Sequence, residues 1–216
     1  MKRILFQGDS ITDANRSRKE EEFYCTGHGY ATLVAARISF EKPGEFEFIN
    51  RGVSGDRIPN ILERRNRDII NLRPNYMSVL IGVNDVWHEL EASDGTPAPL
   101  YESLYDCVIS ESLKAVPGLK IAILEPFVLQ NTNIEGYYKE FRNGVEERAA
   151  AARRVADKYG LTFIPLQAKL DEAAALSGDS AHWLRDGVHP TAAGHKLIAD
   201  EWYDKFYKSA IEEDLK

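Results

Sequence analysis

Ser10, Asp186 and His189 are of the residue types that together carry out nucleophilic catalysis. A serine hydroxyl is a weak nucleophile until a neighbouring base takes its proton, and a histidine oriented by a carboxylate is a common base. Asp186 and His189 are three positions apart on a turn bounded by Pro190. This spacing predicts that the carboxylate accepts a hydrogen bond from one imidazole nitrogen and leaves the other nitrogen facing outward.

The reaction would also need hydrogen-bond donors for a developing oxyanion, and losing one such donor typically lowers the rate about 10²–10³-fold. We expect three donors: the backbone N–H groups of Ser10 and Gly55 and the side-chain amide of Asn84. Gly55 suits this role because a glycine has no Cβ to block close approach. Gly52 is the alternative to Gly55 as this glycine; we favour Gly55 and interpret Gly52 as the residue that forms the turn.

Short apolar segments alternate with longer amphipathic ones along the chain. The apolar segments predict buried parallel strands at residues 3–7, 46–50, 76–82, 120–125 and 161–166. The amphipathic segments predict helices at residues 28–40, 58–72, 100–116, 134–159, 168–176 and from an N-cap at Thr191 to about residue 211. This alternation predicts one α/β domain over residues 1–216, a flavodoxin-like three-layer α/β/α sandwich with a five-stranded parallel sheet.

The candidate residues come from four short polar segments near the ends of predicted strands. They are residues 8–12, 52–56, 82–85 and 186–190. Open parallel sheets bind ligands beyond the carboxyl ends of their strands, so we expect all four segments at one rim. Asp9 and Asp85 each follow a glycine, and we expect them to bond to the backbone there as structural supports.

These four segments, in this order, resemble the four conserved blocks of the SGNH (GDSL) hydrolase superfamily. The resemblance spans residues 8–190 and implies ester hydrolysis on a flavodoxin-like sandwich without metal or organic cofactor. It implies that Ser10 is the nucleophile, His189 the base and Asp186 its orienting carboxylate. Gly55 and Asn84 would be oxyanion donors. The chain lacks a Gly-x-Ser-x-Gly elbow around Ser10, which disfavours the α/β-hydrolase fold.

Residues 9–13, 26–30, 50–55 and 81–87 look like the intracellular acetylxylan-esterase branch of that superfamily. The implied reaction is removal of short acyl groups, in particular acetyl, from xylo-oligosaccharides or related sugars. Trp87 could stack on a sugar ring or line an acyl pocket, and packing within its loop is equally compatible with the sequence.

Other functions remain open. A lysophospholipase or an acyl-thioesterase of the same superfamily would need a long apolar channel, and an acyltransferase could use the same triad. A noncatalytic flavodoxin-like binding module is a more distant alternative, because the sequence has no glycine-rich phosphate-binding loop.

Composition limits the partners and the cellular compartment that we expect for this protein. The chain has 216 residues, 44% of them apolar, and a formal charge of −7, which disfavour disorder and nucleic acid as a partner. No apolar run is long enough for a signal-peptide core or a membrane span. Cys25 and Cys107 form no metal-binding pattern and are interpreted as free thiols. We therefore expect a cytoplasmic enzyme for a small-molecule ester, and monomeric and homo-oligomeric states are both compatible with the sequence.

The remaining polar residues have ordinary structural interpretations. We expect the histidines outside the triad to lie on the surface or to pack: His28, His88, His182 and His195. The charged run at residues 63–68 predicts a solvated helix face. Three cations follow the Ser10 segment and could border the cleft, but we expect them to pair with the acidic residues 20–22: Arg16, Arg18 and Lys19.

Overall fold

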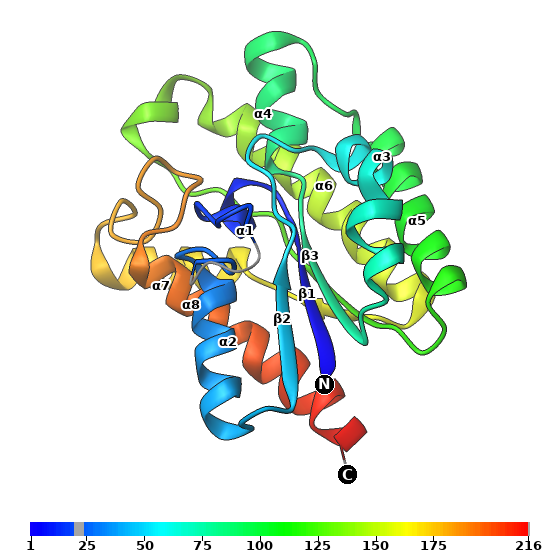
Figure 1. Cartoon of the computed structure of the whole chain (residues 1–216). Coiled ribbons are helices and arrows are strands. Elements are labelled where there is room, and N and C mark those ends of the chain that lie inside the picture. Colours follow the sequence, from blue (N-terminus) through cyan, green and yellow to red (C-terminus); the bar gives the residue numbers. More distant parts are fainter. Residues whose placement is uncertain (20–23, 216) are drawn as a thin grey trace.

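The computed structural model describes residues 1–19 and 24–215, and its centre is a five-stranded parallel sheet in the order β2-β1-β3-β4-β5. The strands are β1 (Lys2–Gly8), β2 (Phe46–Asn50), β3 (Tyr76–Leu80), β4 (Lys120–Leu124) and β5 (Thr162–Ile164). All five lie where the apolar segments predicted them. The α/β sandwich with a parallel sheet is confirmed (Figure 1).

Helices cover both faces of the sheet. The α-helices are α1 (Ser10–Asp13), α2 (Tyr30–Glu41), α3 (Ile58–Asp68), α4 (Val83–Ala92), α5 (Ala98–Ala115), α6 (Tyr138–Tyr159), α7 (Gln167–Ser177) and α8 (Ala192–Trp202). Short 3₁₀ helices occupy Ile70–Leu72, Thr132–Tyr137 and Glu213–Leu215, and a π-helical segment, Tyr203–Ile211, continues α8. Thr191 caps α8 as predicted, since its side chain accepts a hydrogen bond from the Gly194 N–H at 3.3 Å.

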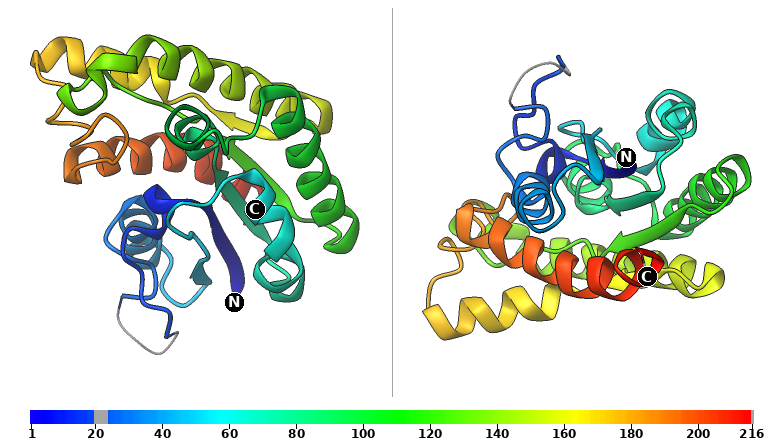
Figure 2. Two further views of the ribbon diagram at one scale, coloured as in Figure 1. Left: turned by 90° about the horizontal axis from the view of Figure 1, so that it is seen from above. Right: turned by 60° about the horizontal axis from the view of Figure 1, so that its bottom comes forward.

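Side chains that alternate along the strands fill two separate cores. Ile4 and Phe6 of β1 pack with α2 and α8, whereas Leu5 between them packs with α3, α5 and α6. This alternation is the two-residue period of a strand buried on both faces. Figure 1 shows the two layers on either side of the sheet, and Figure 2 shows α2 beside α8 from two further directions.

Two helices, α1 and α4, are absent from the sequence-based prediction, and both carry candidate site residues. The α1 helix has four residues, too few for a periodic pattern. The α4 helix begins just after β3, at Val83, and carries both Asn84 and Trp87. Asn84 and Trp87 therefore lie on a helix and not in a strand-end loop.

The carboxyl ends of the first three strands meet at one rim, as predicted. The loop at residues 51–57, between β2 and α3, lies against the end of β1, where the Val53 N–H donates to the Gly8 carbonyl at 3.0 Å. Figure 1 shows α1 and α4 at this rim and both chain termini at the opposite end of the sheet. No helix in residues 1–19 and 24–215 is both long and apolar enough to cross a membrane.

Candidate active site

Ser10 lies at the turn where β1 ends and α1 begins. The preceding residue, Asp9, is the N-cap of α1, and its carboxylate accepts a hydrogen bond from the Ile11 N–H at 2.9 Å. The Ser10 carbonyl accepts from the Ala14 N–H at 2.9 Å, which closes the short helix. The position of Ser10 is thus fixed by the backbone on both sides of it, while its hydroxyl is left for other contacts.

The structure brings Ser10, His189 and Asp186 together in one chain of hydrogen bonds. The Ser10 Oγ lies 2.9 Å from the His189 Nε2, and the His189 Nδ1 lies 2.7 Å from the Asp186 Oδ2. The second carboxylate oxygen, Asp186 Oδ1, accepts from the backbone N–H groups of Val188 at 3.0 Å and His189 at 2.7 Å. The carboxylate therefore fixes both the turn and the imidazole, as the three-residue spacing predicted.

These contacts set the protonation of the pair. Partial burial alone would raise the pKa of Asp186, but the hydrogen bonds from His189 and Val188 outweigh it and hold that pKa well below its usual value. The hydrogen bond to Asp186 raises the pKa of His189 above its ordinary value of 6.5, although partial burial opposes the shift. An anionic Asp186 beside His189 is the charge pattern that stabilises an imidazolium.

Residues of the segment after β4 hold the Asp186–His189 turn from outside. The Leu129 N–H donates to the Gly187 carbonyl at 2.9 Å, and the Asn131 side-chain amide donates to the Arg185 carbonyl at 3.2 Å. The Arg185 N–H in turn donates to the His189 carbonyl at 2.9 Å. The imidazole is therefore presented by a turn in which the Arg185, Gly187 and His189 carbonyls each accept a hydrogen bond.

Asn84 lies in the first turn of α4 and is buried. Its side-chain amide donates to the Asp56 carbonyl at 3.1 Å, which ties α4 to the end of the 51–57 loop. An asparagine amide carries two N–H donors, so one of them remains for another acceptor.

Gly52 and Gly55 have different physical reasons to be glycine. Gly55 is exposed, its φ is +83°, and a Cβ there would meet nothing within 4 Å. Gly52 is buried, and a Cβ there would lie 2.3 Å from the Asp13 backbone nitrogen. The lack of a Cβ at Gly52 permits close packing of the loop on α1, and the turn that we predicted at Gly52 lies instead at Ser54 and Gly55. The left-handed residue of this loop is Gly55.

Asp9 and Asp85 are buried supports of the rim, in line with the sequence interpretation. Asp85 accepts from the Ile58 N–H at 3.2 Å, which fixes the start of α3 against α4. Burial raises the pKa of Asp9 to about 7 and that of Asp85 to about 6.

Trp87 lies next to the hydrogen-bonded chain. Its ring centroid is 6.1 Å from that of His189 and 5.6 Å from that of Phe141, and its Nε1–H donates to a Glu91 carboxylate oxygen at 2.6 Å. The indole therefore packs on helices and also borders the imidazole.

Among the other histidines, His195 packs as expected, but close to the site. Its Nδ1 accepts from the Tyr30 N–H at 3.2 Å, and burial lowers its pKa to about 4, so it is neutral near pH 7. A cleft beside Ser10 is lined mainly by polar residues. Ser54 comes from a segment predicted at the rim, whereas Asn15, Arg185 and His195 carry no sequence signal that connects them with the site. Within the described residues, no group of three or more His, Cys, Asp or Glu side chains could hold a metal ion.

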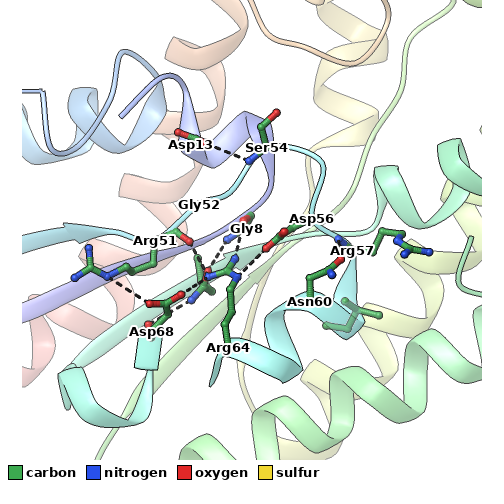
Figure 3. Close-up of polar contacts among 12 residues, drawn as sticks. Gly8, Asp13, Arg51, Gly52, Ser54, Asp56, Arg57, Asn60, Arg64 and Asp68 are labelled. Carbon is green, nitrogen blue, oxygen red and sulfur yellow. Dashed lines mark hydrogen bonds and ion pairs between the residues drawn. The ribbon is translucent and has the colours of Figure 1, made fainter. Parts of the chain in front are cut away.

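The charged run at residues 63–68 is not the fully solvated face that its composition predicted. Asp68 is buried and the Arg64 side chain is only 9% exposed beneath the 51–57 loop, where Arg64 bonds to Asp56 and Asp68 (Figure 3). Arg18 likewise pairs with Asp13, at 2.6 Å from its Oδ2. The acidic partners predicted for Arg18 at residues 20–22 lie outside the described residues. No periodicity marks Arg64; its partners become visible only in the fold.

Comparison with known proteins agrees with this architecture. The profile of the GDSL-like lipase/acylhydrolase family matches residues 6–197. The chain belongs to this family, has the SGNH hydrolase fold and is a carboxylic ester hydrolase.

Three relatives illustrate the similarity. The acetylxylan esterase of Geobacillus stearothermophilus is 29% identical over 203 residues, which cover 91% of this chain and 90% of that protein. A crystal structure of the acetylxylan esterase Axe2 from the same organism superposes with a TM-score of 0.84 and 26% identity, covering 94% of this chain and 93% of the other. A protein assigned as a GDSL-like lipase from Parabacteroides merdae ATCC 43184 superposes with a TM-score of 0.88 and 31% identity, covering 94% of each chain. Two further Axe2 structures are of catalytic mutants, in which an aspartate and a serine are replaced by alanine.

Proposed function

We propose that the protein is a serine esterase that removes short acyl groups, in particular acetyl, from hydroxyl groups of small sugars such as xylo-oligosaccharides. The observation that carries this proposal is the hydrogen-bonded chain from the Ser10 Oγ through His189 to Asp186, at 2.9 and 2.7 Å. The catalytic mutants of Axe2 change the same residue types, a serine and an aspartate.

The reaction proceeds by two displacements. The Ser10 Oγ attacks the ester carbonyl while the His189 Nε2 takes its proton, and Asp186 stabilises the imidazolium. The tetrahedral oxyanion is held by the N–H groups of Ser10 and Gly55 and by the N–H of Asn84 that is not bonded to Asp56. Collapse breaks the ester bond, and His189 returns the proton to the leaving alcohol. Water then attacks the acyl-enzyme with the same proton transfers and frees the acid.

The sugar assignment is supported by the cleft beside Ser10. Side chains of Asn15, Ser54 and Arg185 offer hydrogen bonds to a polyol, and a long acyl chain would gain little from burial against them. Trp87, beside His189, offers an apolar face on which a pyranose ring could stack. Two free cysteines, Cys25 and Cys107, are compatible with the reducing cytoplasm, where we place the enzyme.

A p-nitrophenyl ester series and one variant test this function. We expect acetate to be hydrolysed faster than octanoate, and Ser10→Ala to lower kcat at least about 10³-fold, because no other group supplies the nucleophile. Acetylated xylo-oligosaccharides should be better substrates than other acetylated sugars. Octanoate hydrolysed faster than acetate would indicate a lipid or thioester substrate, and retained activity of Ser10→Ala would contradict the assigned nucleophile.

A further inference from the structure

The Arg64 side chain occupies an unusual position for a residue on a charged helix face. It projects from α3 beneath the 51–57 loop, and only 9% of the side chain is exposed. A guanidinium is costly to remove from water unless its donors find partners. The hydrogen-bond acceptors of the Arg64 guanidinium therefore indicate which segments this side chain holds in place.

Those partners come from two segments of the proposed catalytic rim, the 51–57 loop and the end of β1, and from Asp68 of α3 itself. The Arg64 Nε donates to the Asp56 Oδ2 at 2.7 Å. One terminal nitrogen donates to the Arg51 carbonyl at 2.8 Å and to the Asp68 Oδ2 at 3.2 Å. The other donates to the Gly8 carbonyl at 3.2 Å. Figure 3 shows the guanidinium between the end of β1 and both ends of the loop.

The contact with Asp56 links Arg64 to Asn84. The Asp56 side chain is held by Arg64, and the Asp56 carbonyl accepts the Asn84 amide at 3.1 Å. A shift of Asp56 would therefore rotate or release the amide that we assign to the oxyanion. Burial raises the pKa of Asp56, and Arg64 opposes this shift, so the contact also favours the anionic, bonded carboxylate.

The loop position of Gly55 depends on its neighbours in the same way. Gly55 itself is exposed with open space around it, so packing at that residue does not fix its N–H. The residues on either side are anchored, Ser54 by its N–H to the Asp13 Oδ2 at 3.1 Å and Asp56 by Arg64. The Arg64 guanidinium thus helps to position two of the three proposed oxyanion donors, the Asn84 amide and the Gly55 N–H.

We propose that Arg64 is a positioning residue for the oxyanion site, which it holds through Asp56 and the neighbouring strand ends without touching the substrate. This proposal rests on the proposed esterase function. It requires arginine in particular, because a planar fork can bond a carboxylate and two backbone carbonyls in different directions, whereas a lysine ammonium cannot span them.

The test compares Arg64→Met with Arg65→Met, a matched control on the next residue of α3. Arg65 bonds to Glu111 and to the Leu62 carbonyl, away from the rim. On p-nitrophenyl acetate we expect Arg64→Met to lower kcat about 10–100-fold with KM changed less than about twofold, because misplaced donors lose part of the oxyanion stabilisation. Arg65→Met should keep kcat within about twofold. Equal kcat values in the two variants would overturn the proposal.

A double-mutant cycle with Asn84→Ala separates positioning from general structural support. If Arg64 acts through Asn84, Arg64→Met should lower kcat much less in the Asn84→Ala background than in the wild type. If the fold-loss of kcat in the double variant equals the product of the two single-variant losses, Arg64 does not act through Asn84 and the proposal is overturned. Arg64→Lys, which can keep the ion pair with Asp56 alone, should fall between the wild type and Arg64→Met, and it replaces Arg64→Met in the cycle if the methionine variant does not fold.

Activity assays on the wild type and on Ser10→Ala, which both keep Arg64, separate the proposed esterase function from the proposed role of Arg64. An active wild type with an inactive Ser10→Ala supports the esterase function whatever the Arg64 variants do. A wild type without activity on p-nitrophenyl acetate or acetylated xylo-oligosaccharides would overturn both proposals. An active wild type with an unaffected Arg64→Met would overturn only the role of Arg64.

Discussion

At the scale of single residues, the site is a relay in which each group sets the proton affinity of the next. Asp186 receives two backbone N–H groups as well as the imidazole of His189, and it is therefore anionic at any pH at which the enzyme would work. His189 gains basicity from that carboxylate. In the proposed mechanism Ser10 needs a neutral His189, so the contact that makes His189 a stronger base also raises the pH below which His189 is protonated.

The pH profile of kcat/KM should reflect this. Activity should fall as His189 becomes protonated, with a midpoint above pH 6.5, because the hydrogen bond to Asp186 raises its pKa. Asp186→Asn should lower kcat by about 10⁴ and move the acid limb to lower pH. Asp171→Asn, which removes a partner of Arg142 outside the site, should leave the profile unchanged. A wild-type midpoint at or below 6.5 would contradict the assignment of His189 as the base.

At the scale of elements, the 51–57 loop is clamped from two sides. On the α1 side, Arg16 donates to the Gly52 carbonyl at 2.9 Å and Asp13 accepts the Ser54 N–H. On the α3 side, Arg64 holds Asp56. A surface loop of this length would otherwise be mobile, and these contacts give it the preorganisation that oxyanion stabilisation requires.

Alanine at each loop glycine should separate packing from backbone conformation. Gly52→Ala places a Cβ 2.3 Å from the backbone of Asp13, and we expect it to lower the free energy of unfolding by about 1–3 kcal/mol. Gly55→Ala meets no atom but must adopt a φ of +83°, which costs about 1–2 kcal/mol and which the loop can relieve by moving. Urea unfolding of both variants tests this. A larger loss of stability in Gly55→Ala than in Gly52→Ala would contradict it.

The helix α4 shows which elements the sequence could have revealed. Its apolar residues have helical spacing, but only two residues separate them from β3, so the sequence alone favours a strand-end loop there: Val83, Val86, Trp87 and Leu90. The strands were predictable because they are buried on both faces and almost continuously apolar. Ser10, Asp186 and His189 were predictable because local spacing and motif order carry their signal. The role of Arg64 was not, because its partners at Gly8 and Asp56 are brought to it only by sheet topology.

At the scale of the whole molecule, the fold buries acidic groups directly beneath the rim. Asp9 is 1% exposed, and within the part of the chain that the structure describes its Oδ2 has no hydrogen-bond partner. Burial raises its pKa from 3.8 to about 7. Between about pH 4 and 7, Asp9 is therefore protonated in the folded protein and ionised in the unfolded chain.

Stability should decrease with rising pH because of this proton. Between about pH 4 and 7 the unfolded state binds fewer protons at Asp9 than the folded state, so the free energy of unfolding falls by up to about 1.4 kcal/mol per pH unit from this group. Asp9→Asn should remove that contribution, as measured by urea unfolding at pH 5 and 7. The control Asp204→Asn removes an exposed carboxylate and should leave the decrease in place. An unchanged pH dependence in Asp9→Asn would contradict the prediction.

The hydrogen bond between Ser10 and His189 joins residues 179 positions apart. Ser10 follows β1, an inner strand that pairs with both β2 and β3, while His189 follows the last strand and its helix. The chain must therefore complete its long-range strand pairing before the hydroxyl and the imidazole can meet, and such non-local contacts form slowly. During synthesis, Ser10 emerges long before its base. In the proposed mechanism, the serine of a nascent chain would consequently be inert, and ester cleavage would require that the strands of the sheet have paired.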